Sequence, residues 1–208
     1  MTVRSSVPEP PATLAASLAE PSRDVQTDPL VELTIYSSDS RASGRLALSA
    51  DRMTDLLNGA EEFNLVDLSA QSLEDGHELV LPEAVVLRAE MYAVAVSGPR
   101  GNPLRRIRTR PCPVEIRLRR YDVSGHLHAF PGTDPVAGFH HRQEVMVPLT
   151  EATIAYDSPA GRVITRYDTL LVNRLLVDHI APARRWDVRP PGEEDDTEHP
   201  SASEATAE

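Results

Sequence analysis

Arginines concentrate in one stretch of this 208-residue chain. All 21 basic residues are arginines, and seven of them fall between positions 105 and 120. Because a guanidinium group forms paired hydrogen bonds with phosphate oxygens, this spacing predicts a site for an anion or a nucleic acid. The candidate binding residues in this stretch are Arg105, Arg106, Arg108, Arg110, Arg117 and Arg119. Since lysine is absent, chemistry that needs a phosphate-loop lysine or a Schiff base is excluded.

A nucleic-acid site of low sequence preference also needs aromatic side chains on which bases stack, worth about 1–3 kcal/mol per base. Aromatic residues make up only 4% of this chain. Binding by arginines alone would depend on counterion release and would weaken steeply with added salt. An RNA- or nucleotide-binding module that uses residues 105–120 is therefore our alternative hypothesis for the function.

Four histidines follow the arginine-rich stretch, at His126, His128, His140 and His141. The first two are two positions apart, which places them on one face of a strand. No cysteine or carboxylate accompanies them with the spacing of a metal site, so we expect no metal and no other cofactor. Cys112 lies between two prolines without an acid–base partner, and we expect it to pack as a small apolar residue.

The common catalytic motifs are missing from the chain. It contains no Gly-x-Ser-x-Gly, His-Glu-x-x-His or Gly-x-Gly-x-x-Gly sequence and no phosphate loop. Glu61 and Glu62 are adjacent carboxylates before Phe63, but neighbours in a turn point in different directions and do not support acid–base catalysis. We therefore predict that the protein is not an enzyme.

The elements that carry these side chains occur twice. The strand pattern of residues 31–36 and 44–48 returns at residues 114–119 and 125–129, about 81 to 83 positions later. Apolar and polar residues alternate in both copies, as in half-buried strands, and Gly44 and Gly125 stand where a small barrel must bend or bulge. The repetition predicts two copies of one small β unit that arose by duplication.

The predicted fold is mostly β, with two tandem small β-barrel units of the Sm or SH3 type and at most one short helix in each. The predicted organisation is a disordered tail at 1–28, a first repeat at 29–98, a linker at 99–110, a second repeat at 111–186 and an acidic disordered tail at 187–208. Both tails are too polar to offset the entropy of ordering.

Only the first copy has a clear helix signal. Ser49 is a suitable N-cap for a helix over residues 50–58, and Gly59 is a suitable end. The matching stretch of the second copy, residues 130–135, contains two prolines and is predicted to be a loop.

Several short motifs resemble the Sm-like family of small barrels. Asp55, Leu57 and Asn58, followed by Phe63-Asn64-Leu65-Val66-Asp67, are similar to its first half, and Leu170-Leu171-Val172-Asn173-Arg174 is similar to its closing strand pair. An asparagine or arginine of that pair lies near bound RNA in the family, so the resemblance adds Asn173 and Arg174 to the candidate anion site. In this comparison Glu90-Met91 takes the place of Asn173-Arg174 in the first copy. The chain is also similar to duplicated, uncharacterised small barrels of bacterial genomes, which implies no known activity.

The charge differs between the two copies. Residues 29–100 hold five arginines and twelve carboxylates, a net charge of −7, whereas residues 101–186 hold thirteen arginines and eight carboxylates, a net charge of +5. This asymmetry could orient the copies against each other or attract an anionic partner to the second. The apolar runs are too short to cross a bilayer and no signal peptide is recognisable, so we expect a cytoplasmic protein without membrane contact.

We therefore hypothesise a non-enzymatic protein-interaction or assembly module built from a duplicated small barrel. Small barrels leave strand edges that accept another strand, either from a protein partner or from a second copy. Nucleic acid is the less favoured partner. The candidate edge is residues 170–177.

Overall fold

The structure is a computed structural model that describes residues 28–97, here called the first half, and residues 108–183, the second half. Residues 1–27 of the predicted tail at 1–28, the whole predicted tail at 187–208 and residues 99–107 of the predicted linker at 99–110 lie outside the described residues. Arg105 and Arg106 lie outside them as well.

Each half has the same order of elements: two strands, a short α-helix, two strands, a 3-10 helix and a last strand. The first half consists of β1 (Leu30–Tyr36), β2 (Ser40–Ala47), α1 (Met53–Gly59), β3 (Glu62–Ser72), β4 (Glu78–Leu87), η1 (Arg88–Glu90) and β5 (Ala93–Val96). The second half consists of β6 (Arg110–Leu118), β7 (Tyr121–Ala129), α2 (Pro135–His140), β8 (Met146–Ser158), β9 (Gly161–Asn173), η3 (Arg174–Leu176) and β10 (His179–Pro182).

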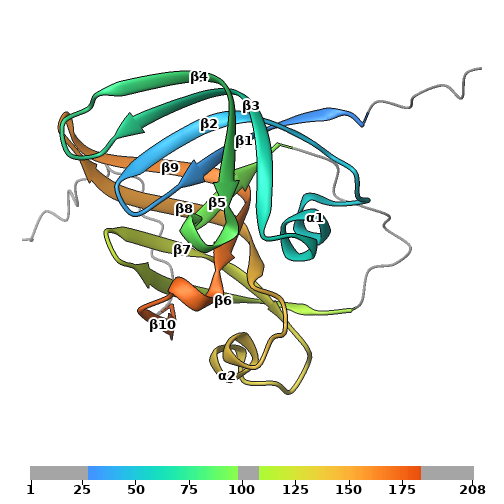
Figure 1. Ribbon diagram of the computed structural model, residues 1–208. Helices are drawn as coiled ribbons and strands as arrows, with labels where there is room; N and C mark the ends of the chain where they lie inside the picture. The colour runs from blue at the N-terminus through green and yellow to red at the C-terminus, as the bar shows by residue number, and fades with distance from the viewer. Residues whose placement is uncertain (1–27, 98–107, 184–208) are drawn as a thin grey trace, which may run out of the picture.

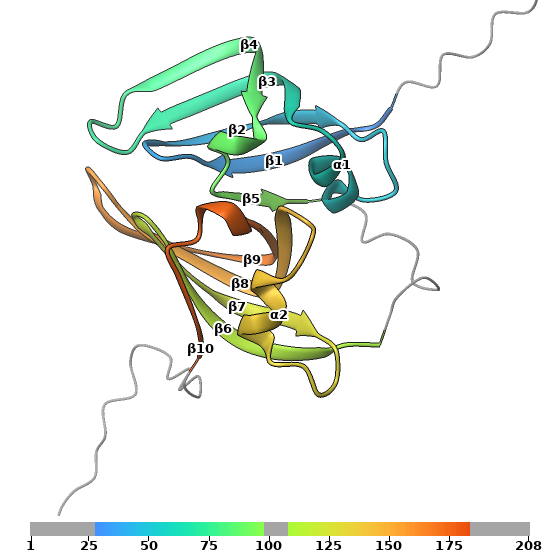
Figure 2. The ribbon, with the colours of Figure 1, turned by 60° about the horizontal axis from the view of Figure 1, so that its bottom comes forward.

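The ten strands form one open antiparallel sheet in the order β10-β6-β7-β8-β9-β5-β1-β2-β3-β4 (Figure 1). The prediction of a mostly β protein is therefore confirmed. Figure 2 shows the first half, in blue and green, above the second half, in yellow and orange, with β5 next to β9 where they meet. The sheet ends at β4 on one side and at β10 on the other.

Two apolar clusters form the cores of the two halves, and each contains residues of the other half. Met146 and Leu171 belong to the cluster of the first half, and both are fully buried. Tyr36, Leu73 and Ala93 belong to the cluster of the second half. Because neither half buries its core alone, we expect the two halves to unfold together.

Matching backbone hydrogen bonds define which residues of the two halves are equivalent. Arg88 N–H donates to Glu61 O at 2.7 Å, and Arg174 N–H donates to Val145 O at 2.8 Å. The bond from Tyr92 N–H to Tyr36 O at 2.8 Å likewise matches the bond from Asp178 N–H to Arg117 O at 3.0 Å. The separation of equivalent residues is therefore 81 at Tyr36, 84 at Glu61 and 86 from Arg88 to Tyr92.

This correspondence corrects the sequence comparison of the two copies. Gly44 lies opposite Leu33 and Gly125 lies opposite Val114, so Val114 matches Leu33 and not Val31. Because alternation has a period of two residues, a shift by two preserves the pattern and escapes sequence comparison. The placement of Glu90-Met91 opposite Asn173-Arg174 is also wrong, since Arg88 matches Arg174.

The glycine at the bend of each half sits at a β-bulge, as predicted. The β2–β3 register shifts next to Gly44 and the β7–β8 register shifts next to Gly125. Asp67 and Glu151 occupy the bulges with φ values of 53° and 50°, a left-handed conformation that is uncommon for residues with a side chain. Each pairs with a basic side chain, Asp67 with Arg45 and Glu151 with His126.

The helix of the first half is shorter than predicted, and the loop of the second half leads into a helix that was not predicted. Helix α1 begins at Met53 after Arg52, without a side-chain cap, and not at residue 50 after Ser49. The loop predicted at residues 130–135 extends through residue 134, and α2 begins at Pro135, so the second half has one short helix, within the predicted limit of one in each half. Asp134 caps it by accepting a hydrogen bond from Ala137 N–H at 2.7 Å, and Pro135 stands in the first turn, where a missing N–H costs nothing.

The bend at Gly125 offers a test of the bulge. A Cβ atom there would lie 3.1 Å from Ala152 Cα and 3.2 Å from Thr150 O, both backbone atoms, so the strand backbone itself would have to shift to make room. We expect Gly125→Ala to lower the free energy of unfolding by about 1–3 kcal/mol in urea denaturation. Gly59→Ala is the matched control, since nothing lies within 4 Å of its Cβ position. Equal stability of the two variants would contradict this account of the bend.

Candidate assembly interface

The two halves are joined by a strand pair of their own. Residues 93–95 of β5 pair antiparallel with residues 170–172 of β9, and all six are buried. Strand β9 thus has β8 on one side and β5 on the other. The predicted free edge at residues 170–177 is therefore wrong for its strand portion, because that portion is already paired inside the chain.

Side chains from β8 and β9 complete the core of the first half at this junction. Leu171 and Met146 lie in the same apolar cluster as Leu57, Met91 and Val94 of the first half. The exposed fraction of each of these five side chains is 4% or less. The junction is therefore a continuation of a core and not a surface contact.

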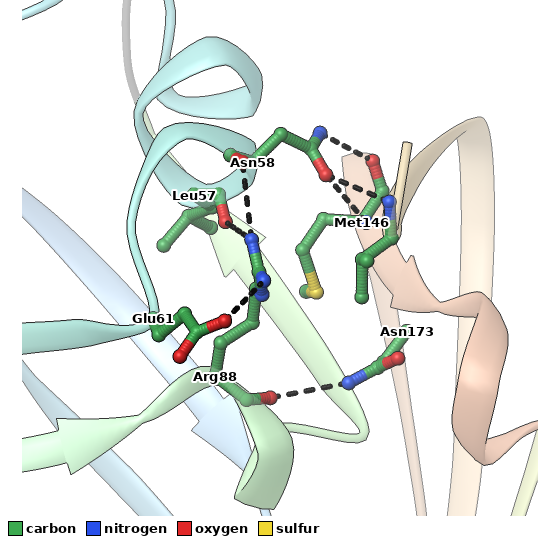
Figure 3. A network of polar contacts seen from close by, with 7 residues as sticks. Leu57, Asn58, Glu61, Arg88, Met146 and Asn173 are labelled. Atoms are coloured by element: carbon green, nitrogen blue, oxygen red, sulfur yellow. Dashed lines mark hydrogen bonds and ion pairs between the residues drawn. The ribbon is translucent and has the colours of Figure 1, made fainter. Parts of the chain in front are cut away.

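Asn58, at the end of α1, fastens the first half to the backbone of the second (Figure 3). Its Oδ1 accepts hydrogen bonds from Val145 N–H at 2.9 Å and Met146 N–H at 2.8 Å. Its Nδ2 donates to Met146 O at 3.0 Å and to Thr54 O at 2.9 Å. The amide is suited to this position because it supplies an acceptor and donors from one planar group.

Two equivalent arginines hold the helices against the strands. Arg88 Nη1 donates to the carbonyls of Leu57 and Asn58 at 3.3 and 3.0 Å (Figure 3). Arg174 Nη1 donates to His140 O at 3.3 Å, and its Nε donates to Glu144 O at 3.3 Å. The guanidinium groups thus satisfy carbonyls at the C-terminal ends of α1 and α2, where a positive charge is favourable.

Asn173, predicted with Arg174 to lie near a bound anion, is 1% exposed. Its Nδ2 donates to Arg88 O at 3.1 Å, and its Oδ1 accepts from Leu175 N–H at 3.1 Å. Its backbone N–H donates to Tyr92 O at 2.9 Å. All three hydrogen bonds are internal, and two of them cross the junction.

All five tyrosines of the chain gather at the junction. Tyr36 and Tyr92 come from the first half, and Tyr121, Tyr156 and Tyr167 come from the second. The Tyr36 and Tyr167 hydroxyl oxygens are 2.6 Å apart, and the Tyr121 hydroxyl donates to Ser37 O at 2.6 Å. Burial raises the pKa of Tyr36 and of Tyr121 far above that of a free tyrosine, so both phenols stay protonated.

The two outermost strands expose surfaces equivalent to those that meet inside the chain. Because equivalent residues here are 86 positions apart, residues 84–86 of β4 match the paired residues 170–172 of β9. Residues 179–181 of β10 match the paired residues 93–95 of β5. Among the described residues, no strand pairs with the outer edge of β4 or of β10.

The candidate arginines that the structure describes do not form one cluster. Arg110 and Arg117 stand at the two ends of β6, about 23 Å apart for seven residues of extended chain. Arg117 pairs with Asp122 at 3.0 Å, and Arg119 Nη1 donates to the Tyr92 hydroxyl at 3.5 Å. Arg108 is exposed.

The histidines also have individual partners. The ring of His128 lies between the Thr109 hydroxyl at 3.2 Å and the Thr150 hydroxyl at 2.9 Å. Partial burial lowers the pKa of His128. His126 Nδ1 lies 3.5 Å from a Glu151 carboxylate oxygen. Within residues 28–97 and 108–183, no three histidine, cysteine or carboxylate side chains are grouped to hold a metal ion.

Comparison with known proteins found no matching family model, no similar curated protein and no matching solved structure. In the part of the chain that the structure describes, no helix has the length and apolar character needed to cross a bilayer. The interface must therefore be interpreted from its own geometry.

Sequence reasoning singled out Asn58 as a motif residue but missed its part in the junction, and it missed Arg88 altogether. The available signal was the pair formed by Arg88 and Arg174, which stand 86 positions apart, each just after a strand rich in valine and leucine. The misaligned comparison of the copies concealed this pair.

Removal of the Asn58 amide tests the junction. Asn58→Ala leaves three backbone groups at residues 145 and 146 without their partner, and we expect the free energy of unfolding to fall by about 2 kcal/mol in urea denaturation. Asn64→Ala is the control, because that side chain is exposed on β3. If the two variants were equally stable, Asn58 would not hold the halves together.

Proposed function

We propose that this protein is a non-enzymatic assembly module in which β10 of one copy pairs with β4 of another. The observation that carries the proposal is the internal β5–β9 pair, because its structural equivalents, β10 and β4, have no strand on their outer edges among the described residues. A strand edge with unpaired N–H and C=O groups is a template for another strand. The proposal assigns no catalytic residue.

The internal pair also supplies the register of the contact between chains. Inside the chain, Ala93 lies opposite Val172 and Val94 lies opposite Leu171. Their equivalents place His179 opposite Val86 of the partner and Ile180 opposite the partner's Val85. Ile180 is 6% exposed and already packed in the core of its own half, as Val94 is in the first half.

The exposed apolar residues of β4 support the pairing of its outer edge with another strand. Val85 is 59% exposed, whereas its equivalent Leu171 is fully buried in the neighbouring half. Leu79, Val80 and Leu87 on the same strand are 51%, 67% and 42% exposed. Exposed apolar residues on an edge strand favour pairing with another strand, although Glu78, Pro82 and Glu83 on β4 limit where along the strand this can occur.

The distribution of charge favours pairing of the β4 end of one copy with the β10 end of another. The first half belongs to a segment of net charge −7 and the second half to a segment of net charge +5. Pairing β4 with β10 brings opposite charges together, whereas pairing two copies of one end brings like charges together. Such a head-to-tail contact closes into a ring or continues as a filament, depending on the rotation between successive copies.

We also propose that the two halves are tandem repeats of one small barrel-like unit of the Sm type. The shared element order, the bulges at Gly44 and Gly125 and the matching arginines Arg88 and Arg174 support this. Nucleic-acid binding has less support, because Arg117 is paired, Arg174 bonds to carbonyls and the tyrosines are packed at the junction.

Substitution of Val85 tests the edge. We expect size-exclusion chromatography with light scattering to show that the full chain associates in a concentration-dependent way. Val85→Lys should reduce the association constant by at least about tenfold, because it places a charge where the internal junction buries Leu171. Val80→Lys is the matched control, since its equivalent, Arg166, lies on β9 outside the paired residues.

A chain that stays monomeric at all concentrations would contradict the proposed function. Equal association of the Val85→Lys and Val80→Lys variants would show that β4 does not pair in this register.

A further inference from the structure

We propose that acid strengthens the junction between chains, because Glu62 and His140 occupy the places that Met146 and Asn58 occupy in the junction within the chain. This inference rests on the proposed pairing of β4 with β10. It adds a regulation to that site, with tight association at about pH 5.5 and weak association at about pH 8, the range in which histidine changes charge.

The place of Glu62 follows from the backbone. Glu61 and Val145 accept equivalent hydrogen bonds, from Arg88 N–H and Arg174 N–H, so the next residues, Glu62 and Met146, are equivalent. The registers agree, since Glu62 lies opposite Leu87 and Met146 lies opposite Asn173. Met146 is fully buried in the core of the first half, whereas Glu62 is exposed in the single chain.

Pairing of β4 with β10 would carry Glu62 to the apolar cluster of the partner's second half. Met146 packs in a cluster with Leu57, Met91 and Val94. The equivalent residues of the second half are Phe139, Val177 and Ile180, which belong to its apolar cluster. An ionised carboxylate is costly beside such a cluster unless a cation pairs with it, and protonation removes the cost.

The cation is supplied by His140, the equivalent of Asn58. Arg88 bonds to Asn58 O and Arg174 bonds to His140 O, which places the two residues at the same point of their helices. An imidazole cannot accept two N–H groups and donate to a carbonyl as the Asn58 amide does. When protonated, however, it brings a positive charge to the side chains of Glu61 and Glu62 of the partner.

The other charged groups near this contact do not reverse the direction of the pH effect. Residues 139–144 and 174–179 of the second half also carry His141, Arg142, Glu144, Arg174, Asp178 and His179, and Arg117 and Arg119 neighbour residues 179 and 178. The Asp178 carboxylate accepts from Arg119 N–H, and Arg174 bonds to carbonyls. The corresponding segments of the first half, residues 53–62 and 83–90, carry Asp55, Glu61, Glu62, Glu83 and Glu90 and the cation Arg88, whose Nη2 lies 3.8 Å from a Glu61 carboxylate oxygen.

The direction of the pH effect follows from proton uptake. The associated state favours a protonated His140 beside carboxylates and a neutral or cation-paired Glu62, so association takes up protons. A state that binds more protons gains stability as the pH falls, by about tenfold in the association constant per pH unit for each proton taken up. Histidine and carboxylate protonation therefore act in the same direction.

The experiment replaces Glu62 and His140 by Met and Asn, the residues found at the equivalent places of the internal junction. The full chain and the double variant Glu62→Met/His140→Asn are compared by light scattering at pH 8 and pH 5.5. We expect the unmodified chain to associate at least about tenfold more tightly at the lower pH. The double variant should associate at pH 8 as tightly as the unmodified chain does at pH 5.5, with no remaining pH dependence.

The double variant Glu74→Met/His77→Asn makes the same changes of charge on the turn between β3 and β4 and is the matched control; it should keep the pH dependence of the unmodified chain. Adding Val85→Lys to the first double variant should abolish its association. If the unmodified chain associates equally at both pH values, the inference is wrong and the proposed function stands. If neither the unmodified chain nor the Glu62→Met/His140→Asn variant associates at either pH, the proposed function itself is wrong.

Discussion

Backbone N–H and C=O groups at the edge of a sheet need partners, and at the centre of this protein β5 and β9 supply them to each other. The pair makes one sheet of two five-stranded halves, and it allows Leu171 and Met146 to enter the core of the first half. Asn58 and the five tyrosines add contacts at the same junction. The rest of the structure depends on this pair, because each core includes residues of the other half.

Within residues 28–97 and 108–183, no strand meets the same constraint at the outer edges of β4 and β10. A repeat whose units join edge to edge must end with two unlike edges, and a chain of two units therefore presents one of each. The internal junction buries the Met146 side chain and hydrogen-bonds the Asn58 amide, whereas the outer edges carry Glu62 where Met146 stands and His140 where Asn58 stands. Charged side chains at an edge strand limit uncontrolled pairing while leaving the edge usable. We interpret the difference as follows: the junction within the chain forms at any pH, whereas the junction between chains forms tightly only at low pH.

Much of the fold was predictable from local patterns. Alternation identified the strands of both copies, and the two glycines marked the bulges, because both signals depend only on near neighbours. The register between the copies was not predictable, since a shift by two residues leaves alternation intact. Helix α2 was missed because Pro135 was taken as a breaker, although proline is well suited to the first turn of a helix.

The site was less predictable, because it depends on contacts between distant residues. Asn58 bonds to a backbone 88 positions away, and nothing near Asn58 in the sequence indicates that partner. The arginines were recognisable by type, but their separation along β6 and the carboxylate beside Arg117 appear only in the folded chain. The edge predicted at residues 170–177 had the right composition for strand pairing, but its partner lies within the same chain.

The most direct test of the central claim is disulfide trapping between chains that lack Cys112. One preparation carries Val85→Cys and the other carries Ile180→Cys, and the two are mixed and mildly oxidised. Directly opposed residues of antiparallel strands have Cα atoms about 4.5–5.5 Å apart, within the reach of a disulfide. The account predicts a covalent dimer from this mixture and none from Val80→Cys mixed with Ile180→Cys. No dimer from the first mixture, or equal dimer from both, would contradict the pairing of β4 with β10.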